Sequence, residues 1–107
     1  MIGMARQSAQ QRVAHLLIDL FVRVHGHSPR AGEEMHLPLT QVRIGDALGL
    51  TAIHVNRMLG QLRLAGAAVV RRRKLRILSP ARLLALAESG HLAAPKAREP
   101  KLLPTAA

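Results

Sequence analysis

The chain has 107 residues, with 16 Lys and Arg against six Asp and Glu, which gives a formal net charge of +10 and an isoelectric point near 11.9. This length predicts one domain, and the absence of cysteine excludes a disulfide framework, a thiolate zinc site and a cysteine nucleophile. The apolar runs are far shorter than the ~20 residues that a membrane span requires, and no secretory signal is visible. We therefore expect a protein inside the cell, with no membrane partner and a polyanion as the partner that its charge favours.

The first predicted element is a helix over about residues 5–24. One apolar stripe recurs at the spacing of a helix face, namely Ala9, Val13, Leu16, Leu17, Leu20 and Val24. A second stripe lies beside or opposite the first: Ala14, Ile18, Phe21 and Val22. Either the last helix or a small sheet covers this second stripe within the domain, or it is an open surface for self-association or for another protein.

Two further helices are predicted after a break that contains Gly26, Ser28, Pro29 and Gly32. Residues 35–39 come first, as a short strand or an extended segment. Thr40 is placed to cap a helix that ends at Gly49 and buries Ile44, Ala47 and Leu48. Thr51 is placed to cap the next helix, which stops at Gly66 and buries Val55, Met58, Leu59 and Leu62.

The sequence pattern of the last third of the chain predicts a hairpin, a short helix and a tail. Residues 68–70 and 75–78 are expected as strands around the basic turn 71–74. Ser79 and Pro80 then open a helix that contains Leu83, Leu84, Leu86 and Ala87. Prolines alternate with basic residues beyond Gly90, which predicts a flexible basic tail over 91–107 after a domain that occupies 1–90.

The helices between Thr40 and Gly66 meet the residue requirements of a helix-turn-helix. If Gln41 is counted first, Gly45 is fifth, where the helices cross closely, and Gly49 is ninth, where the turn favours a positive φ. The fourth, eighth, tenth, fifteenth and eighteenth positions, which face the interior, are apolar: Ile44, Leu48, Leu50, Val55 and Met58. The sequence therefore predicts a mainly α fold with a small β-hairpin wing, a winged helix-turn-helix with its motif at 40–66 and its wing at 67–78.

The ordered motifs of residues 9–87 resemble the C-terminal winged helix-turn-helix domain of the Crp/Fnr transcription regulators. The resemblance lies in LPLTQ at 37–41, IGDALGLT at 44–51, HVNR at 54–57 and the segment 59–66. It implies DNA binding and transcription regulation in the bacterial cytoplasm, on the nucleoid. Family members usually carry an N-terminal sensor barrel and a long dimerisation helix, and this sequence begins after both, so we expect no cofactor and no small-molecule effector site.

Docking physics assigns base contacts to the second helix of the motif, because its N-terminal half enters the major groove. The outward candidates are Ala52, Ile53, Asn56 and Arg57. Arg57 would grip guanine O6 and N7, and the resemblance also gives it a base-contacting position. Asn56 would read adenine or hold a phosphate, whereas Ala52 and Ile53 offer only apolar contact, for example to a thymine methyl. The alternatives are a buried Ile53 and a solvated Arg57.

Two groups of residues are expected to hold phosphates. Free amides and the helix dipole favour phosphate oxygens near Thr40, Gln41, Thr51 and His54, although simple capping by the threonines is an equally good interpretation. The wing residues would neutralise flanking phosphates or enter the minor groove, unless they form only a solvated face. These are Arg71, Arg72, Arg73 and Lys74, with Arg76 beside them.

Taken together, the motifs predict sequence-specific binding of double-stranded DNA and not an enzyme. His25 and His27 lack further metal ligands nearby in sequence, and no nucleophile or acid–base pair is recognisable. A single Phe provides no stacking platform for single strands. The competing interpretations are a protein-interaction module and a truncated regulator that binds DNA only non-specifically. A monomer would read one half-site of the DNA. A homodimer or a partner protein bound through the first helix would extend the DNA site beyond that half-site.

Overall fold

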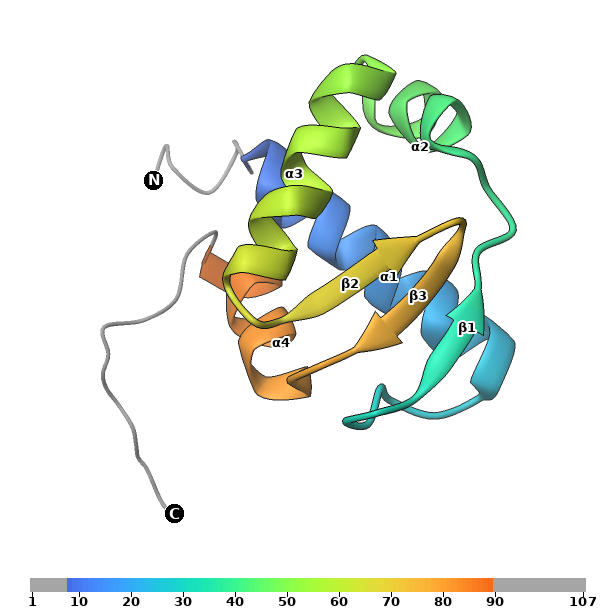
Figure 1. Ribbon diagram of the computed structural model, residues 1–107, viewed down its shortest axis with the longest axis vertical. Helices are drawn as coiled ribbons and strands as arrows, with labels where there is room; N and C mark the ends of the chain where they lie inside the picture. Colours follow the sequence, from blue (N-terminus) through green and yellow to red (C-terminus); the bar gives the residue numbers. More distant parts are fainter. Residues whose placement is uncertain (1–7, 90–107) are drawn as a thin grey trace.

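A computed structural model describes residues 8–89, which form four helices and a three-stranded antiparallel sheet (Figure 1). The elements in chain order are α1 (Ala9–His25), β1 (Glu34–His36), α2 (Gln41–Leu48), α3 (Ala52–Leu64), β2 (Ala68–Arg71), β3 (Lys74–Ile77) and α4 (Pro80–Ser89). The predicted mainly α fold with a wing, a winged helix-turn-helix, is confirmed. The basic tail predicted over 91–107 lies outside the described residues.

Helix α1 begins at Ala9, so its predicted start near residue 5 is wrong. The backbone of Ser8 is extended, with φ −68° and ψ 162°, and Ser8 serves as the N-cap. Its hydroxyl accepts a hydrogen bond from the Gln11 amide at 3.1 Å, and the Gln11 side-chain oxygen accepts one from the Ser8 amide at 2.9 Å. This reciprocal capping box fixes the helix start, because it pairs two amides that have no partner inside the helix.

Both apolar stripes of α1 contribute to one core, because α4 packs along this helix (Figure 1). Ala14 and Phe21 of the second stripe are completely buried, and Ile18 packs against the core. The last helix therefore covers part of the second stripe within the domain, as one of the two interpretations expected, and leaves Val22 exposed. Val22 and Val24 remain 39% and 59% exposed near the end of α1, so Val24 does not belong to the buried face.

Helices α2 and α3 pack at the close crossing that the motif predicts. Gly45 is buried, and a Cβ at this position would overlap the carbonyl oxygen of Leu50. Gly49 ends α2 with φ 73°, a conformation that glycine adopts without steric cost. Ala47 was expected in the buried stripe but is exposed, because this short helix buries only the side that carries Ile44 and Gly45. The predicted buried face of α3 is confirmed: Val55, Met58, Leu59 and Leu62.

The sheet has the order β1-β3-β2, so the hairpin is joined by a third strand. Leu75 of β3 pairs with Met35 on one side and Val70 on the other. The expected strand 35–39 instead spans Glu34–His36, and it stops two residues before Pro38, which has no amide to donate to a ladder. The predicted four-residue basic turn is shorter than expected, because Arg71 ends β2 and Lys74 begins β3.

Helix α4 starts as the Ser79-Pro80 pair predicts. The Ser79 hydroxyl accepts a hydrogen bond from the Arg82 amide at 3.2 Å. Three of the four predicted apolar residues, Leu83, Leu86 and Ala87, are buried, whereas Leu84 faces outward. No helix within residues 8–89 is long and apolar enough to cross a membrane.

Candidate nucleic-acid interface

The outward face of α3 presents the predicted base-contacting residues. Ile53 is 73% exposed, so its assignment to the core is excluded. Asn56 and Arg57 are also exposed, and Ala52 is half-buried at the first turn. Ile53 and Arg57 lie opposite the buried face that contains Val55, and Ala52 and Asn56 lie on its flanks, because successive residues are separated by about 100° around a helix of 3.6 residues per turn. The face combines one cation, one amide and an apolar patch at the helix N-terminal half.

The Arg57 guanidinium takes part in neither of the two ion pairs found in the described part of the chain. Those pairs join Lys74 to Glu34 at 3.7 Å and, when the His27 ring is protonated, His27 to Glu33 at 3.6 Å. The first turn of α3 contains no acidic residue that would compete for this cation. A planar guanidinium of this kind presents its donors in the fork geometry that matches guanine O6 and N7.

The N-termini of α2 and α3 are capped by the two predicted threonines. Thr40 Oγ1 accepts a hydrogen bond from the Arg43 amide at 3.2 Å, and Thr51 Oγ1 accepts one from the His54 amide at 3.0 Å. Capping is therefore observed at both positions. It leaves each hydroxyl its own O–H donor, so capping and phosphate contact are compatible. Gln41 is half-buried at the first position of α2, and neither helix has an acidic residue in its first turn.

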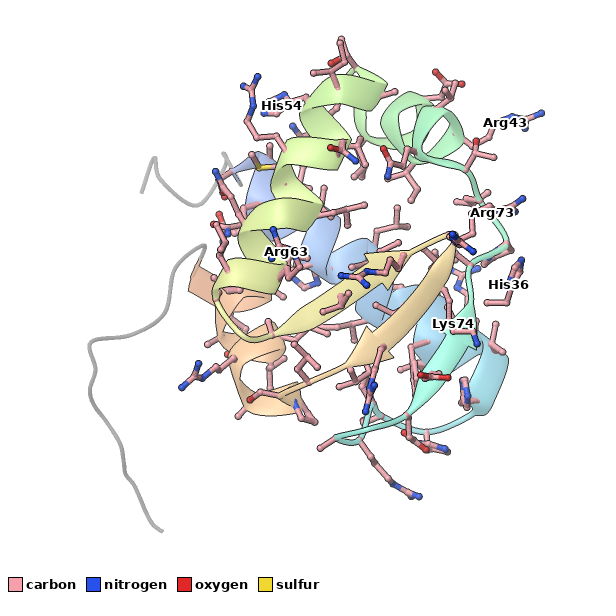
Figure 2. The ribbon with its side chains drawn as sticks, viewed as in Figure 1. His36, Arg43, His54, Arg63, Arg73 and Lys74 are labelled. Atoms are coloured by element: carbon pink, nitrogen blue, oxygen red, sulfur yellow. The ribbon has the colours of Figure 1, made fainter. Side chains whose placement is uncertain are left out.

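His54 and Arg63 lie at different ends of α3. Figure 2 shows His54 near the first turn of α3 and Arg63 near the last turns, beside β2. His54 is half-buried, and its amide is the group that Thr51 caps. The structure thus brings His54 to the same helix terminus as Thr51, away from the wing.

The wing tip is held against the segment that leads into α2. The Arg73 guanidinium donates to the Leu37 carbonyl at 3.1 Å, and the Leu37 amide donates to the Arg73 carbonyl at 2.7 Å. Lys74 forms its ion pair with Glu34 of β1. Arg73 and Lys74 therefore also make contacts within the domain, and all four predicted wing cations, Arg71, Arg72, Arg73 and Lys74, are exposed.

Basic side chains line one edge of the molecule from α2 to β1. Figure 2 shows Arg43, Arg73, His36 and Lys74 in succession along this edge. Sequence reasoning missed Arg43, although it lies one helical turn from Thr40. It also missed Arg63. The sequence did carry a signal, because Arg63 follows Asn56 by seven residues, which is two helical turns and places both residues on the same side of α3.

We predict opposite effects on stability and on DNA binding from the double substitution Arg72→Asn/Arg73→Gly. Both arginines have positive φ, 53° and 64°, a conformation that costs about 1–2 kcal/mol for an ordinary residue and that Asn-Gly adopts readily. Loss of the Arg73 contact to Leu37 offsets part of the gain, so we expect thermal unfolding to show a net stabilisation of about 1 kcal/mol.

The same double variant should bind duplex DNA more weakly. Each phosphate contact that is lost lowers the slope of log affinity against log salt by about 0.9. An unchanged slope, measured by titration at several salt concentrations, would show that the wing tip contacts no phosphate.

The described histidines do not assemble a metal site. The ring of His25 stacks on Phe21 with centroids 4.0 Å apart, and His27 contacts Glu33. Between residues 8 and 89 no group of three or more His, Asp or Glu side chains is arranged to hold a metal ion.

Comparison with known proteins decides the family. Residues 11–86 match the family of Crp-like helix-turn-helix domains. The chain belongs to this family. It is a family of transcription-regulator domains that bind DNA, not a family of enzymes. The chain is also 34% identical over 86 residues to the fumarate and nitrate reduction regulatory protein of Vibrio cholerae, an alignment that covers 78% of this chain and 33% of the relative.

Solved structures of similar proteins show the same fold. FixK2 from Bradyrhizobium japonicum superposes with a TM-score of 0.63 at 34% identity, over 84% of this chain and 41% of that chain. A Crp/Fnr-family transcriptional regulator from Thermus thermophilus gives a TM-score of 0.61 at 25% identity, over 80% of this chain and 43% of that chain. This Crp-like domain therefore spans about a third to two fifths of the length of these relatives.

Proposed function

We propose that this Crp-like domain binds double-stranded DNA sequence-specifically, and regulates transcription, by inserting α3 into the major groove. The observation that carries the proposal is the exposed face of α3 with Ile53 and Arg57, in a domain that also has two capped helix N-termini and a basic wing. A groove-reading helix needs such a face of base-contacting side chains with phosphate-binding groups on both flanks. The similarity to a Crp/Fnr-family transcriptional regulator from Thermus thermophilus supports a role in a bacterial cytoplasm, on chromosomal DNA.

In this proposal Arg57 reads a guanine and Ile53, with Ala52, contacts the methyl group of a thymine. Asn56 either reads adenine or holds a phosphate. The phosphate contacts come from two helix termini and the wing, namely Thr40, Gln41, Thr51, His54, Arg71, Arg72, Arg73 and Lys74. The DNA-binding domain occupies residues 1–90 in this proposal, and residues 91–107 add a basic tail.

The direct test is selection from a random duplex library at near-physiological salt. An enriched sequence supports specific readout, and an inverted repeat with half-sites ~34 Å apart would show that two copies bind together. Binding that enriches no sequence and only weakens as salt rises would contradict the proposal. That result would instead favour a remnant that binds DNA through phosphates alone.

We predict that Ile53 makes the selected sequence sensitive to a single methyl group. Replacing thymine by uracil at the contacted position removes the C5-methyl and should lower the affinity of the wild-type domain by roughly three- to fourfold, the effect of about 0.8 kcal/mol of lost apolar burial. Ile53→Ala should bind both duplexes alike. The proposed contact is wrong if no thymine in the selected site shows this difference, which competition binding measures.

A further inference from the structure

A polar hollow lies between α3, the first residue of α2 and strand β2. It measures about 180 Å³ and is lined by Gln41, Asn56, Leu59, Gly60, Arg63 and Val70. Gly60 opens this space, because a Cβ added there would meet nothing within 4 Å. We call it the Gly60 hollow. It is distinct from the wing tip, and Arg63, its only charged lining residue, was not among the predicted phosphate ligands.

The Gly60 hollow has the composition of an anion site. Its lining carries one guanidinium and two side-chain amides and no carboxylate. Arg63 belongs to neither of the ion pairs formed within residues 8–89, and its guanidinium has no protein hydrogen-bond partner there. Figure 2 shows Arg63 on the part of α3 beside β2, where its side chain reaches the hollow. An exposed guanidinium next to amide donors favours a phosphate oxygen, for which a bidentate contact is available.

We propose that the Gly60 hollow holds one phosphate of the DNA backbone, with Arg63 as its main donor and the amides of Gln41 and Asn56 beside it. The inference rests on the proposed docking of α3. When the N-terminal half of that helix occupies the major groove, its last turns leave the groove next to the sugar-phosphate backbone, at the height of Gly60 and Arg63. The hollow thus assigns Asn56 to the backbone and not to an adenine.

The test measures affinity against salt on a mixed-sequence duplex, with three variants. Arg63→Gln removes the positive charge and the guanidinium fork, Gly60→Leu fills the hollow, and Arg23→Gln removes the same charge from the exposed end of α1. We expect Arg63→Gln to bind about tenfold more weakly than wild type at physiological salt and to reduce the salt slope by about 0.9, and Arg23→Gln to leave both nearly unchanged. Thermal melts of all variants verify folding.

The filled hollow supplies the decisive comparison. In the Gly60→Leu background, Arg63→Gln should have no further effect on the salt slope, because the phosphate no longer reaches the hollow. The inference is overturned if Arg63→Gln changes the affinity and the salt slope no more than Arg23→Gln does. It is also overturned if Arg63→Gln still lowers the salt slope when position 60 is leucine. Library selection tests the proposed function independently. An enriched motif without an effect of Arg63→Gln would refute the phosphate site in the Gly60 hollow and leave the proposed function standing. An Arg63 effect without a motif refutes only the proposed sequence specificity.

Discussion

The substitution Arg57→Ala is expected to remove the guanine preference at one position of the selected sequence. Arg57 projects from the exposed face of α3 and has no ion-pair partner in the described structure, so its removal leaves the fold intact. A bidentate contact to guanine contributes ~1–3 kcal/mol of discrimination, which corresponds to roughly 5- to 150-fold in relative affinity. Parallel library selections with wild type and variant measure this loss directly.

Two controls separate base readout from simple charge. Arg57→Lys keeps the charge but lacks the planar fork, so it should retain most of the non-specific affinity while losing much of the guanine preference. Arg23→Ala removes a cation on α1 and should leave the selected sequence unchanged. If Arg57→Ala weakens binding to every duplex equally, Arg57 contacts a phosphate and the proposed reading role is wrong.

The substitution Gly45→Ala is expected to destabilise the domain strongly. The added Cβ would overlap the backbone carbonyl oxygen of Leu50, and a backbone group cannot rotate away as a side chain does. Relief therefore requires the two helices of the motif to separate, at the expense of packing around Ile44. We expect a loss of about 3 kcal/mol, which lowers the melting temperature of a domain this small by roughly 12–24 °C in calorimetry.

The same substitution at Gly60 provides a matched control. A Cβ at Gly60 meets nothing within 4 Å, so Gly60→Ala should be neutral or raise stability by up to about 1 kcal/mol, the helix preference of Ala over Gly. Equal melting temperatures for the Gly45 and Gly60 variants would show that the helix crossing has room for a side chain. The requirement for glycine at position 45 would then be wrong.

The caps and turns of the motif could be predicted because they depend on neighbouring residues. Thr40 and Thr51 pair with amides three residues further on, and Gly49 closes α2 through its own backbone. The start of α1 depends equally on local contacts, through the Ser8 and Gln11 pair, yet the prediction placed it about four residues too early. Apolar periodicity indicates that a helix exists, but the capping residue determines where it begins.

The candidate site was predictable only where a helix wheel decides exposure. The wheel placed Ile53 and Arg57 outward, and the structure agrees. It did not predict that Arg63 would share a hollow with Gln41, because these residues lie on different helices and meet only through the α2–α3 crossing and β2.

By itself the sequence determined the two capped helices, the glycines of their crossing and the basic hairpin, since each depends on contacts within a few residues. Tertiary structure alone decided that β1 joins the hairpin, that α4 covers the second stripe of α1 and that Arg73 binds Leu37. In each of these cases the partners are far apart in the chain, and local preference carries no information about which distant surface a side chain will meet.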